Sequence, residues 1–470
     1  MQTDSKDPNA NNGGVNAMSL EDATSASKEG QPRVFIETYG CQMNLADSEL
    51  MGGILKGKGY AAADDMESAD VILINTCAVR EKAEERVFGR LSHLLQLKRD
   101  NPDLVLGVTG CMAEHLKEKI VDRAPYVDLV VGPDAYRRLP SLVEQQLDAG
   151  MGAAGIDVKL DKEETYEGLM PSREAGMSGW ITVQRGCDKF CTFCIVPFVR
   201  GRERGVAPKE ILTQARHLAE MGYQEVTLLG QTVNSYRHED TDFADLLEMV
   251  AKIDGLERIR FTSPYPIDFT PKLIETMARH EKICKYLHLP VQSGSERILK
   301  KMRRGYTRVE YEQLVTDIRA AMPDVAISTD IIVGFPSETE EEYEMTRELI
   351  ESTRYDFAYL FKYSERSNTY AARKLEDDIP EKVKRRRLRE VIDLQEEISA
   401  SIFRSRIGGT YKLMVEGPSK KDPAEWCGRT DDFKTAVFPY REGLTRGDIV
   451  KVKVTDCTSH TLLGQLVQDA

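Results

Sequence analysis

The sequence lacks long hydrophobic runs, a signal-like start and an excess of positive charge. No stretch approaches the roughly 20 consecutive apolar residues that span a bilayer, and the first residues lack the apolar core of a signal peptide. We therefore expect a cytoplasmic protein with no membrane partner. The formal net charge of −13 argues by itself against nucleic-acid binding, although a local basic stripe would be enough to contact phosphates.

Nine cysteines are the most informative residues that the chain does contain. In a protein without a secretory signal they indicate metal or redox chemistry and not a disulfide framework. The hydrophobic content of 41% is enough for packed cores, and 470 residues suggest about three domains. Residues 1–31 are rich in Asn, Ser, Asp, Lys and Gly, which predicts a disordered leader.

Three of the cysteines stand close together in RGCDKFCTFCIVPFVRGRER, and they are Cys187, Cys191 and Cys194. Three thiolates this close can hold three irons of a 4Fe–4S cluster and leave the fourth iron open. The spacings would also place three small buried side chains on one helix face. Gly186, Pro197 and Gly201 favour a loop instead. A zinc site would want a fourth protein ligand nearby.

Between residues 32 and 149 the pattern is strand, loop, helix, repeated. The predicted strands are Val34–Thr38, Val71–Asn75 and Leu104–Val108, and the clearest amphipathic helix is Glu81–Lys98. This alternation predicts a parallel sheet with right-handed crossovers. Cys41, Cys77 and Cys111 each follow one strand, so they should meet at one edge of the sheet, where open α/β sheets bind ligands. The alternative is that they are unrelated buried thiols.

Residues 150–172 have little periodicity and are interpreted as a linker. A second α/β stretch occupies residues 173–403, with helices such as Pro208–Met221 and Glu338–Glu351. Its predicted strands are Trp180–Gln184, Glu225–Leu229, Arg258–Thr262, Tyr286–Leu289, Ile327–Val333 and Phe357–Phe361. Six such units predict a partial barrel, with the loop of three cysteines at the C-terminal mouth.

Residues 404–470 change in character. Short β-rich runs alternate with turns, and the predicted strands are Thr410–Val415, Thr435–Phe438, Ile449–Val454 and Leu462–Val467. The pattern indicates a small β-barrel of the oligonucleotide-binding type.

The spacing of the Cys187 loop, with Phe193 before its last cysteine, resembles the signature of the radical S-adenosylmethionine (SAM) enzymes. The motifs YGCQMNLADSE, INTCAVRE and GCMAE, together with PVQSGSERILKKMRRGYTR and STDIIVGFPSETEEEY, resemble the methylthiotransferases of that superfamily from residue 32 onward. The resemblance implies an α/β chain with a Rossmann-like N-terminal domain, a partial (βα)6 TIM-type radical SAM barrel and a small C-terminal antiparallel β-barrel, the RNA-binding TRAM domain.

Within the family, the forms RGCDKFCTFCIVPFVRGRERG and GRTDDFKTAVF resemble the MiaB-type tRNA branch. That branch methylthiolates carbon 2 of N6-isopentenyladenosine next to the anticodon. The segment YSERSNTYAA, Tyr363–Ala372, departs from the family's common Pro-rich loop of the form YSPRPGTPAA. The family's other members act on threonylcarbamoyladenosine in tRNA or on an aspartate of a small-subunit ribosomal protein. A non-catalytic iron–sulfur RNA sensor is the alternative from another functional class.

The resemblance also implies the cofactors and partners. One 4Fe–4S cluster on Cys187, Cys191 and Cys194 would reduce one SAM to generate a radical, and an auxiliary 4Fe–4S cluster on Cys41, Cys77 and Cys111 would hold the sulfur that a first SAM methylates. The cofactor carries such chemistry while the protein positions it. The implied partners are a tRNA carrying N6-isopentenyladenosine, a low-potential electron-donor protein and a sulfur-donor system, and we expect a monomer.

Residues at other strand ends could contact SAM, although ordinary turn chemistry explains them as well. These candidates are Gly230, Gln231, Asn234, Gln292, Ser293, Thr329 and Asp330, with Phe193 in the cysteine loop. Arg304 could meet a carboxylate or phosphate, or be a solvated charge at a helix end. Cys284, Cys427 and Cys457 have no partner at useful spacing, and His288 is expected to have a structural role.

Contacts with RNA are expected from two basic runs, Lys382–Arg389 and Lys300–Arg308, since basic side chains neutralise backbone phosphates. A solvated helix face is the alternative for each run. Phe433, Phe438 and Tyr440 could stack on bases, but aromatic residues of a small barrel commonly form its core. An anticodon base fits the rule that sequence-specific RNA recognition targets splayed single-stranded loops.

Overall fold

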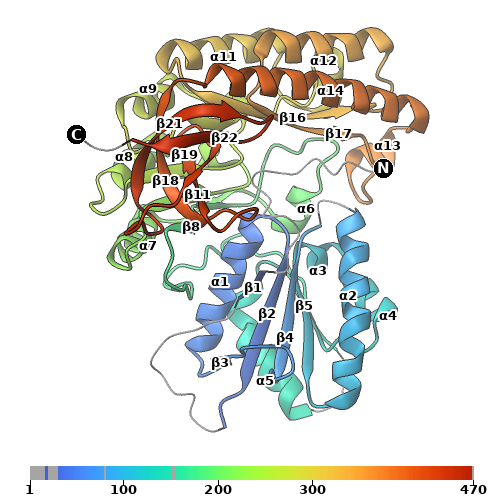
Figure 1. The fold of residues 1–470 in the computed structure, drawn as a ribbon. Helices are drawn as coiled ribbons and strands as arrows, with labels where there is room; N and C mark the ends of the chain where they lie inside the picture. The colour runs from blue at the N-terminus through green and yellow to red at the C-terminus, as the bar shows by residue number, and fades with distance from the viewer. Residues whose placement is uncertain (1–15, 19–29, 79–80, 150–153, 468–470) are drawn as a thin grey trace.

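The computed structural model describes residues 16–18, 30–78, 81–149 and 154–467. In Figure 1 an α/β unit made by the N-terminal part of the chain lies below, and the rest of the chain lies above it. Within the described residues, no helix combines the length and the apolar character needed to cross a bilayer.

The lower unit is built on one sheet of mainly parallel strands. The strands are β1 (Asn16–Met18), β2 (Arg33–Tyr39), β3 (Ala61–Ala62), β4 (Val71–Thr76), β5 (Val105–Gly110), β6 (Leu129–Val131) and β7 (Gly155–Asp157), in the order β1-β2-β4-β5-β6-β7 with β3 beside β2. Its helices are α1 (Gln42–Lys56), α2 (Glu81–Asp100), α3 (Cys111–Leu116), α4 (Glu118–Arg123) and α5 (Leu139–Ala149), after the 3-10 turn η1 (Tyr136–Arg138). Every residue of β4 and β5 is buried, because helices cover both faces. The three predicted strands and their parallel arrangement are confirmed.

Two short edge strands lie where the sequence predicts no structure. β1 lies inside the predicted disordered leader and pairs antiparallel with β2. β7 lies inside the predicted linker and pairs parallel with β6. Strands of three residues are stabilised by backbone hydrogen bonds to a neighbour, which composition and periodicity do not report. The rest of the leader, residues 1–15 and 19–29, and residues 150–153 of the linker lie outside the described residues.

The middle of the chain forms six parallel strands in two groups of three. They are β8 (Ser178–Thr182), β11 (Glu225–Leu229) and β14 (Arg258–Phe261), then β15 (Tyr286–His288), β16 (Ala326–Val333) and β17 (Phe357–Lys362). A single parallel bridge between Ile259 and Ile283 joins the groups. The predicted partial barrel is therefore confirmed.

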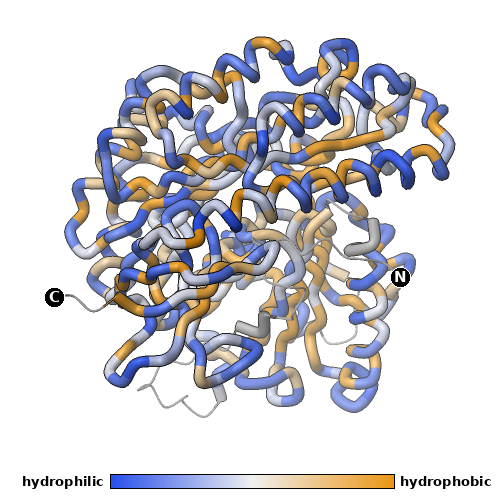
Figure 2. The backbone as a smooth tube through the Cα atoms, turned by 45° about the horizontal axis from the view of Figure 1, so that its top comes forward, coloured by the Kyte–Doolittle hydropathy of each residue, from blue (hydrophilic) through white to orange (hydrophobic). Residues whose placement is uncertain are grey.

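Most helices of this unit cover the outside of the partial barrel, and the short helices at 196–200 and 370–374 lie near the junction with the lower unit (Figure 1). The helices are α6 (Val196–Arg200), α7 (Pro208–Glu220), α8 (Phe243–Ala251), α9 (Pro271–Arg279), α10 (Glu296–Met302), α11 (Arg308–Ala321), α12 (Glu340–Thr353), α13 (Tyr370–Lys374) and α14 (Glu381–Ser405). Two strand pairs, β9 (Gln184–Arg185) with β10 (Arg204–Gly205) and β12 (Arg237–His238) with β13 (Thr241–Asp242), and the 3-10 turns η2 (Val233–Ser235) and η3 (Pro266–Asp268) complete the unit. Figure 2 shows hydrophilic and hydrophobic stretches alternating along the outer helices, as expected for helices with one buried face. Thr307 and Thr339 start α11 and α12 with capping boxes.

The C-terminal strands close into a five-stranded barrel. They are β18 (Thr410–Pro418), β19 (Glu425–Thr430), β20 (Thr435–Pro439), β21 (Ile449–Cys457) and β22 (Leu462–Leu466), in the order β18-β19-β20-β22-β21. The sequence misses β19, because EWCGRT has no clear alternation of apolar and polar residues. An all-antiparallel barrel is wrong for one pair, since β20 and β22 run parallel.

The small barrel docks on the partial barrel at the end where the parallel strands begin. The Arg260 side chain donates to the backbone carbonyls of Thr430 and Asp431. Phe433 stacks on Tyr286 with ring centroids 4.7 Å apart, and Lys434, which is fully buried, pairs with Asp356 at 2.6 Å. The Phe433 ring therefore packs against the partial barrel of the same chain, and the prediction that it stacks on RNA is wrong. The opposite end of the partial barrel, where the cysteine loop lies, stays free of this contact.

Candidate active site

The strand register brings Cys41, Cys77 and Cys111 to one edge of the first sheet. Tyr39 lies beside Thr76 and Thr76 lies beside Gly110 in neighbouring strands, and each cysteine follows its strand within two residues. A hydrogen bond from Cys77 lowers the pKa of the Cys41 thiol to about 6, against the opposing effect of burial. Burial raises the pKa of the Cys111 thiol. Cys41 thus interacts with Cys77 through a hydrogen bond and with Cys111 through its charge.

Buried amides hold the backbone around these cysteines. The Asn44 side chain donates to Asn75 Oδ1 at 3.2 Å and to the Thr76 carbonyl at 3.1 Å, and it accepts from the Cys41 backbone N–H at 3.4 Å. Gly110 has φ = +91°, and a Cβ there would lie 2.4 Å from Asn75 Oδ1. The residue before Cys111 therefore has to be a glycine.

The loop between β9 and α6 contains Cys187, Cys191 and Cys194. The alternative interpretation, that they are buried on one face of a helix, is therefore wrong. The loop starts at Gly186, which has φ = +78° and whose Cβ would lie 1.9 Å from the Arg202 carbonyl. Backbone N–H groups of Cys187 and Cys194 donate to the Gly201 and Cys191 carbonyls. Burial raises the pKa of Cys187 to about 11 and of Cys194 to about 12. Without a metal these thiols stay protonated at neutral pH.

An arginine–aspartate contact connects the two cysteine sites. Arg200, at the end of α6, donates from Nε to Cys111 Sγ at 2.9 Å and from Nη1 to Asp47 Oδ2 at 2.6 Å. Arg185 donates to Asp47 Oδ1 at 2.9 Å, and all three charged side chains are at most 3% exposed. The apolar residues Ala78, Cys111, Ile195 and Val199 pack beside this contact. The Cys187 loop and the strand ends that carry the other three cysteines therefore meet at the junction of the two units.

The segment that departs from the family pattern also spans this junction. Arg366 donates to the Ala78 carbonyl at 3.0 Å, and Ser367 Oγ lies 3.1 Å from His115 Nε2. The YSERSNTYAA loop thus contacts the residue that follows Cys77.

Several candidate SAM contacts lie beside the Cys187 loop. Gln231 accepts from the Gly186 backbone N–H at 2.6 Å, and a Cβ on Gly230 would lie 2.7 Å from Gln184 Oε1. Arg304 donates to Cys191 Sγ at 3.2 Å and is 5% exposed. Arg304 is thus neither a solvated charge nor paired with a carboxylate of the described residues.

Other candidates are used by the protein itself. Both groups of the Asn234 amide bond the Tyr265 backbone, at 2.9 and 2.7 Å. Thr329 Oγ1 donates to the Leu289 carbonyl at 2.9 Å, and Phe193 packs edge-on against Phe335 with centroids 6.4 Å apart. These three side chains therefore help to shape the strand ends.

The remaining candidates lie at the ends of β15 and β16. Ser293 Oγ accepts from the Ser295 N–H at 3.2 Å. Gln292 has φ = +75° and exchanges backbone hydrogen bonds with β16, from its own N–H to the Asp330 carbonyl and from the Ile332 N–H to its carbonyl. The Asp330 carboxylate lies 3.4 Å from His288 Nε2 and is 29% exposed. Of these residues, Asp330 presents the most accessible polar group.

The donor sets fit multi-iron clusters better than single metal ions. Within the residues that the structure describes, no three His, Cys, Asp or Glu side chains are arranged around one metal position. A zinc ion needs about four close ligands, whereas each thiolate of an iron–sulfur cluster binds a separate iron. Cys284 is buried, and Cys427 and Cys457 belong to the small barrel, so they join neither set.

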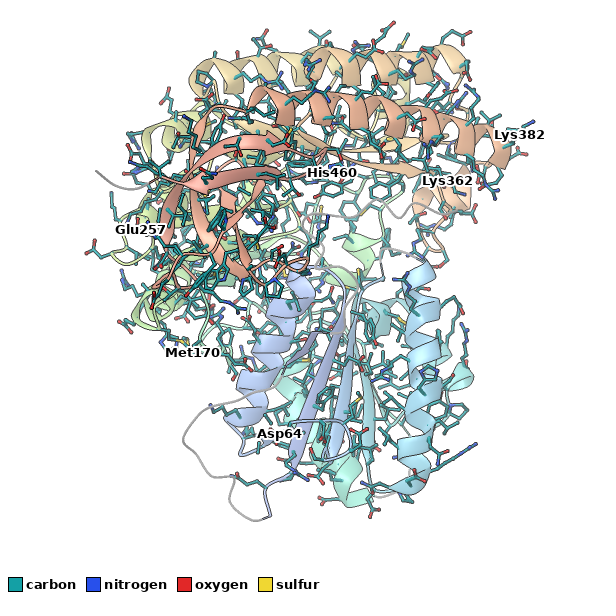
Figure 3. The ribbon with its side chains drawn as sticks, in the orientation of Figure 1. Asp64, Met170, Glu257, Lys362, Lys382 and His460 are labelled. Atoms are coloured by element: carbon teal, nitrogen blue, oxygen red, sulfur yellow. The ribbon has the colours of Figure 1, made fainter. Side chains whose placement is uncertain are left out.

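The basic run Lys382–Arg389 is neutralised by carboxylates. Arg387, buried in α14, pairs with Glu338 and Glu340, and Arg386 pairs with Glu340 and Glu390. Further pairs join Lys384 to Asp377, Arg385 to Glu381 and Arg389 to Asp393. Figure 3 labels Lys382 at the outer end of α14, away from the junction where the cysteines lie. This run is therefore a structural helix face.

Comparison with known families matches three parts of the chain. Residues 33–132 match Uncharacterized protein family UPF0004, residues 181–350 match the Radical SAM superfamily, and residues 404–467 match the TRAM domain. Curated relatives match nearly the whole chain. A tRNA-2-methylthio-N(6)-dimethylallyladenosine synthase from Chloroherpeton thalassium is 47% identical over 92% of this chain and 95% of its own length. One of the same name from Bacteroides thetaiotaomicron is 45% identical over 96% of this chain and 100% of its own length.

Solved structures share the fold at low sequence identity. The radical S-adenosylmethionine methyltransferase TsrM from Kitasatospora setae has a TM-score of 0.54 at 13% identity, covering 71% of this chain and 75% of TsrM. The cobalamin-dependent radical enzyme OxsB has a TM-score of 0.52 at 15% identity, covering 78% of this chain and 58% of OxsB. The curated relatives decide the family: the chain belongs to the radical SAM methylthiotransferases and is an enzyme of that class.

Proposed function

We propose that this enzyme adds a methylthio group to carbon 2 of N6-isopentenyladenosine, next to the anticodon of tRNA. One observation carries the proposal: Arg200, which follows the Cys187 loop in the chain, contacts Cys111 of the other set of three cysteines and Asp47 beside it. The substrate comes from the name that the curated relatives carry. The TRAM match supports an RNA substrate.

The two sets of thiols would each hold a 4Fe–4S cluster with one iron left open. When bound, the cluster on Cys187, Cys191 and Cys194 supplies the electron that cleaves one SAM, and the cluster on Cys41, Cys77 and Cys111 supplies the sulfur that another SAM methylates. Each set of three thiols would leave one iron of its cluster without a protein ligand, whereas a set of four thiols would leave none.

The chain's own residues position these groups. Arg304 donates to Cys191 Sγ and Arg200 donates to Cys111 Sγ, so each site has one buried guanidinium on a ligand sulfur. Hydrogen bonds of this kind orient ligands and stabilise negative charge on sulfur. Gln231, Gly230 and Asp330 lie at the mouth, where the polar ends of SAM would bind. Cys111 is buried and Cys194 is half-buried.

The proposal implies two partners besides tRNA, a low-potential electron-donor protein and a source of sulfur, and a chain that acts as a monomer. The experiment that tests it is anaerobic turnover. The reconstituted enzyme is mixed with SAM, a reductant and tRNA carrying isopentenyladenosine, and the digested RNA is analysed by mass spectrometry.

We expect a methylthio product from the wild type and none from Cys187→Ala or Cys77→Ala. SAM cleavage with no product on this tRNA, but with product on threonylcarbamoyladenosine or on the ribosomal protein, would refute the substrate. RNA binding without any SAM cleavage would refute the enzyme reading in favour of a sensor.

A further inference from the structure

Aromatic rings and arginines, most of them exposed, lie in the Cys187 loop and in the segments next to it. We call this surface the rim, and its residues are Phe190, Phe198, Arg202, Arg303, Tyr370 and Arg373. Phe198 in α6 is 40% exposed and Tyr370 in α13 is 37% exposed, which is unusual for large rings that have a core nearby. Figure 1 shows α6 and α13 near the junction of the two units.

The rim consists of two groups of rings and arginines, and α13 carries a member of each, Tyr370 and Arg373. The Arg303 guanidinium lies over the Tyr370 ring at 4.2 Å from its centroid, and that of Arg373 lies over Phe198 at 5.9 Å. Phe190 and Phe198 meet edge to face with centroids 6.4 Å apart, and Arg202 lies over Phe190 at 5.3 Å. Such pairs present flat faces and positive charge together.

The rim is fixed to the loop that carries the cysteines. The backbone N–H of Thr192 donates to the Met302 carbonyl at 3.0 Å, and the Thr192 carbonyl accepts from the Ala371 N–H at 2.8 Å. Thr192 lies between Cys191 and Cys194, so the end of α10 and the start of α13 are held against the cysteine loop. A molecule seated on the rim would therefore lie at the entrance to the site.

Of the three rim arginines, Arg202 pairs with Asp188, whereas the other two are available to a partner. Arg303 and Arg373 are exposed, and no carboxylate of the described residues pairs with either. By contrast, exposed Arg385 and Arg389 in α14 pair with Glu381 and Asp393. Unpaired guanidinium groups beside exposed rings suit a chain of phosphates and bases, because bases stack on rings and phosphates bind arginine.

From this we propose that the rim is the landing surface for the anticodon loop, whose bases stack on Phe198 and Tyr370 while its phosphates meet Arg303 and Arg373. The inference rests on the proposed function, since it takes RNA as the substrate. It adds a contact surface at the mouth that is separate from the small C-terminal barrel.

Binding of a fluorescent anticodon stem–loop carrying isopentenyladenosine tests the rim. Affinity is measured by anisotropy for the reconstituted full chain without SAM, so that no turnover is needed. Phe198→Leu and Tyr370→Leu keep apolar bulk but remove the ring, and we expect each to weaken binding about tenfold. Phe198→Tyr and Tyr370→Phe keep the ring and should bind like the wild type. An unchanged iron content would show that the cysteine loop still folds.

The salt dependence separates charge from stacking. Arg303→Gln and Arg373→Gln should each reduce the slope of log Kd against log salt by about 0.7, the value for one single-strand phosphate contact. Arg385→Gln and Arg389→Gln are the matched controls on α14, and we expect no change in the slope for either.

Two results would overturn the inference while leaving the proposed function intact. One is a wild type that methylthiolates tRNA while every rim variant binds the stem–loop as tightly. The other is that the rim variants bind RNA as tightly as the wild type but are reduced more slowly by a small acidic electron-transfer protein. That result would make the rim a docking surface for a protein. RNA binding that depends on the rim, without methylthiolation by the wild type, would instead refute the proposed function alone.

Discussion

Replacing Asp47 tests whether the buried contact between the two units holds the cysteine sites together. Asp47 is fully buried and accepts from Arg185 at 2.9 Å and from Arg200 at 2.6 Å. Asp47→Asn keeps the shape of the side chain but removes the negative charge that lies between these two guanidinium groups. Removing one partner of a buried ion pair costs about 3–5 kcal/mol, because the remaining charge is left uncompensated.

The assay is thermal unfolding of the full chain at neutral pH. For a unit of about 150–250 residues, each kcal/mol lowers Tm by ~2–4 °C, so we expect Asp47→Asn to lower it by about 6 °C or more. Asp157→Asn is the matched control, because Asp157 pairs with Arg138, whose side chain is 45% exposed. Exposed pairs contribute at most about 1 kcal/mol, so that variant should lose little stability.

A second readout follows the contact itself. Asp47 and Arg200 pack over the buried Cys111, so Asp47→Asn should open this contact and expose Cys111, which would speed its alkylation in the metal-free protein. Equal Tm values for the Asp47 and Asp157 variants, with unchanged alkylation of Cys111, would refute the view that this network joins the sites.

Two further predictions concern single positions near the cysteines. Gly186→Ala places a Cβ 1.9 Å from the Arg202 carbonyl at a residue with φ = +78°, so this variant should lose about half of the bound iron. Gly89→Ala is the control, because a Cβ on Gly89 of α2 would meet open space. It should keep all of the iron, and its free energy of unfolding should rise by up to ~1 kcal/mol. Burial raises the pKa of Glu114 to about 7 in the native state. Between about pH 4.5 and 7 the native state therefore keeps a proton on Glu114 that the unfolded chain has lost. The free energy of unfolding falls as the pH rises through this range. Glu114→Gln should remove that fall and be more stable than the wild type at pH 8, by at most about 3 kcal/mol, with equal stability at pH 4. Urea unfolding at the two pH values measures this, and the same pH dependence in both proteins would contradict it.

The strands that carry the cysteines could be predicted because burial leaves a direct mark on sequence. β4 is buried at all six positions and consists of apolar residues except for one Asn and one Thr. The convergence of Cys41, Cys77 and Cys111 followed from parallel topology alone. β19 left no such mark, since its first three residues are all half-buried and its two buried positions are Gly428 and Thr430.

The contacts between distant segments could not be predicted from the sequence. Arg200 and Asp47 are 153 residues apart, and nothing in either local pattern names the other. The pairing of the α14 run was partly foreseeable, since Arg385 and Glu381, like Arg389 and Asp393, are four residues apart on one helix face. The position of Phe433 against Tyr286 depends on how two barrels dock, which no single segment encodes.

The count of iron and sulfide per chain tests the central claim, that two sets of three cysteines hold two separate clusters. Anaerobically reconstituted wild type should bind about eight irons, and replacing either set of cysteines with alanine should leave about four. Loss of all iron from one triple variant, or about four irons in the wild type, would contradict the account of two independent sites.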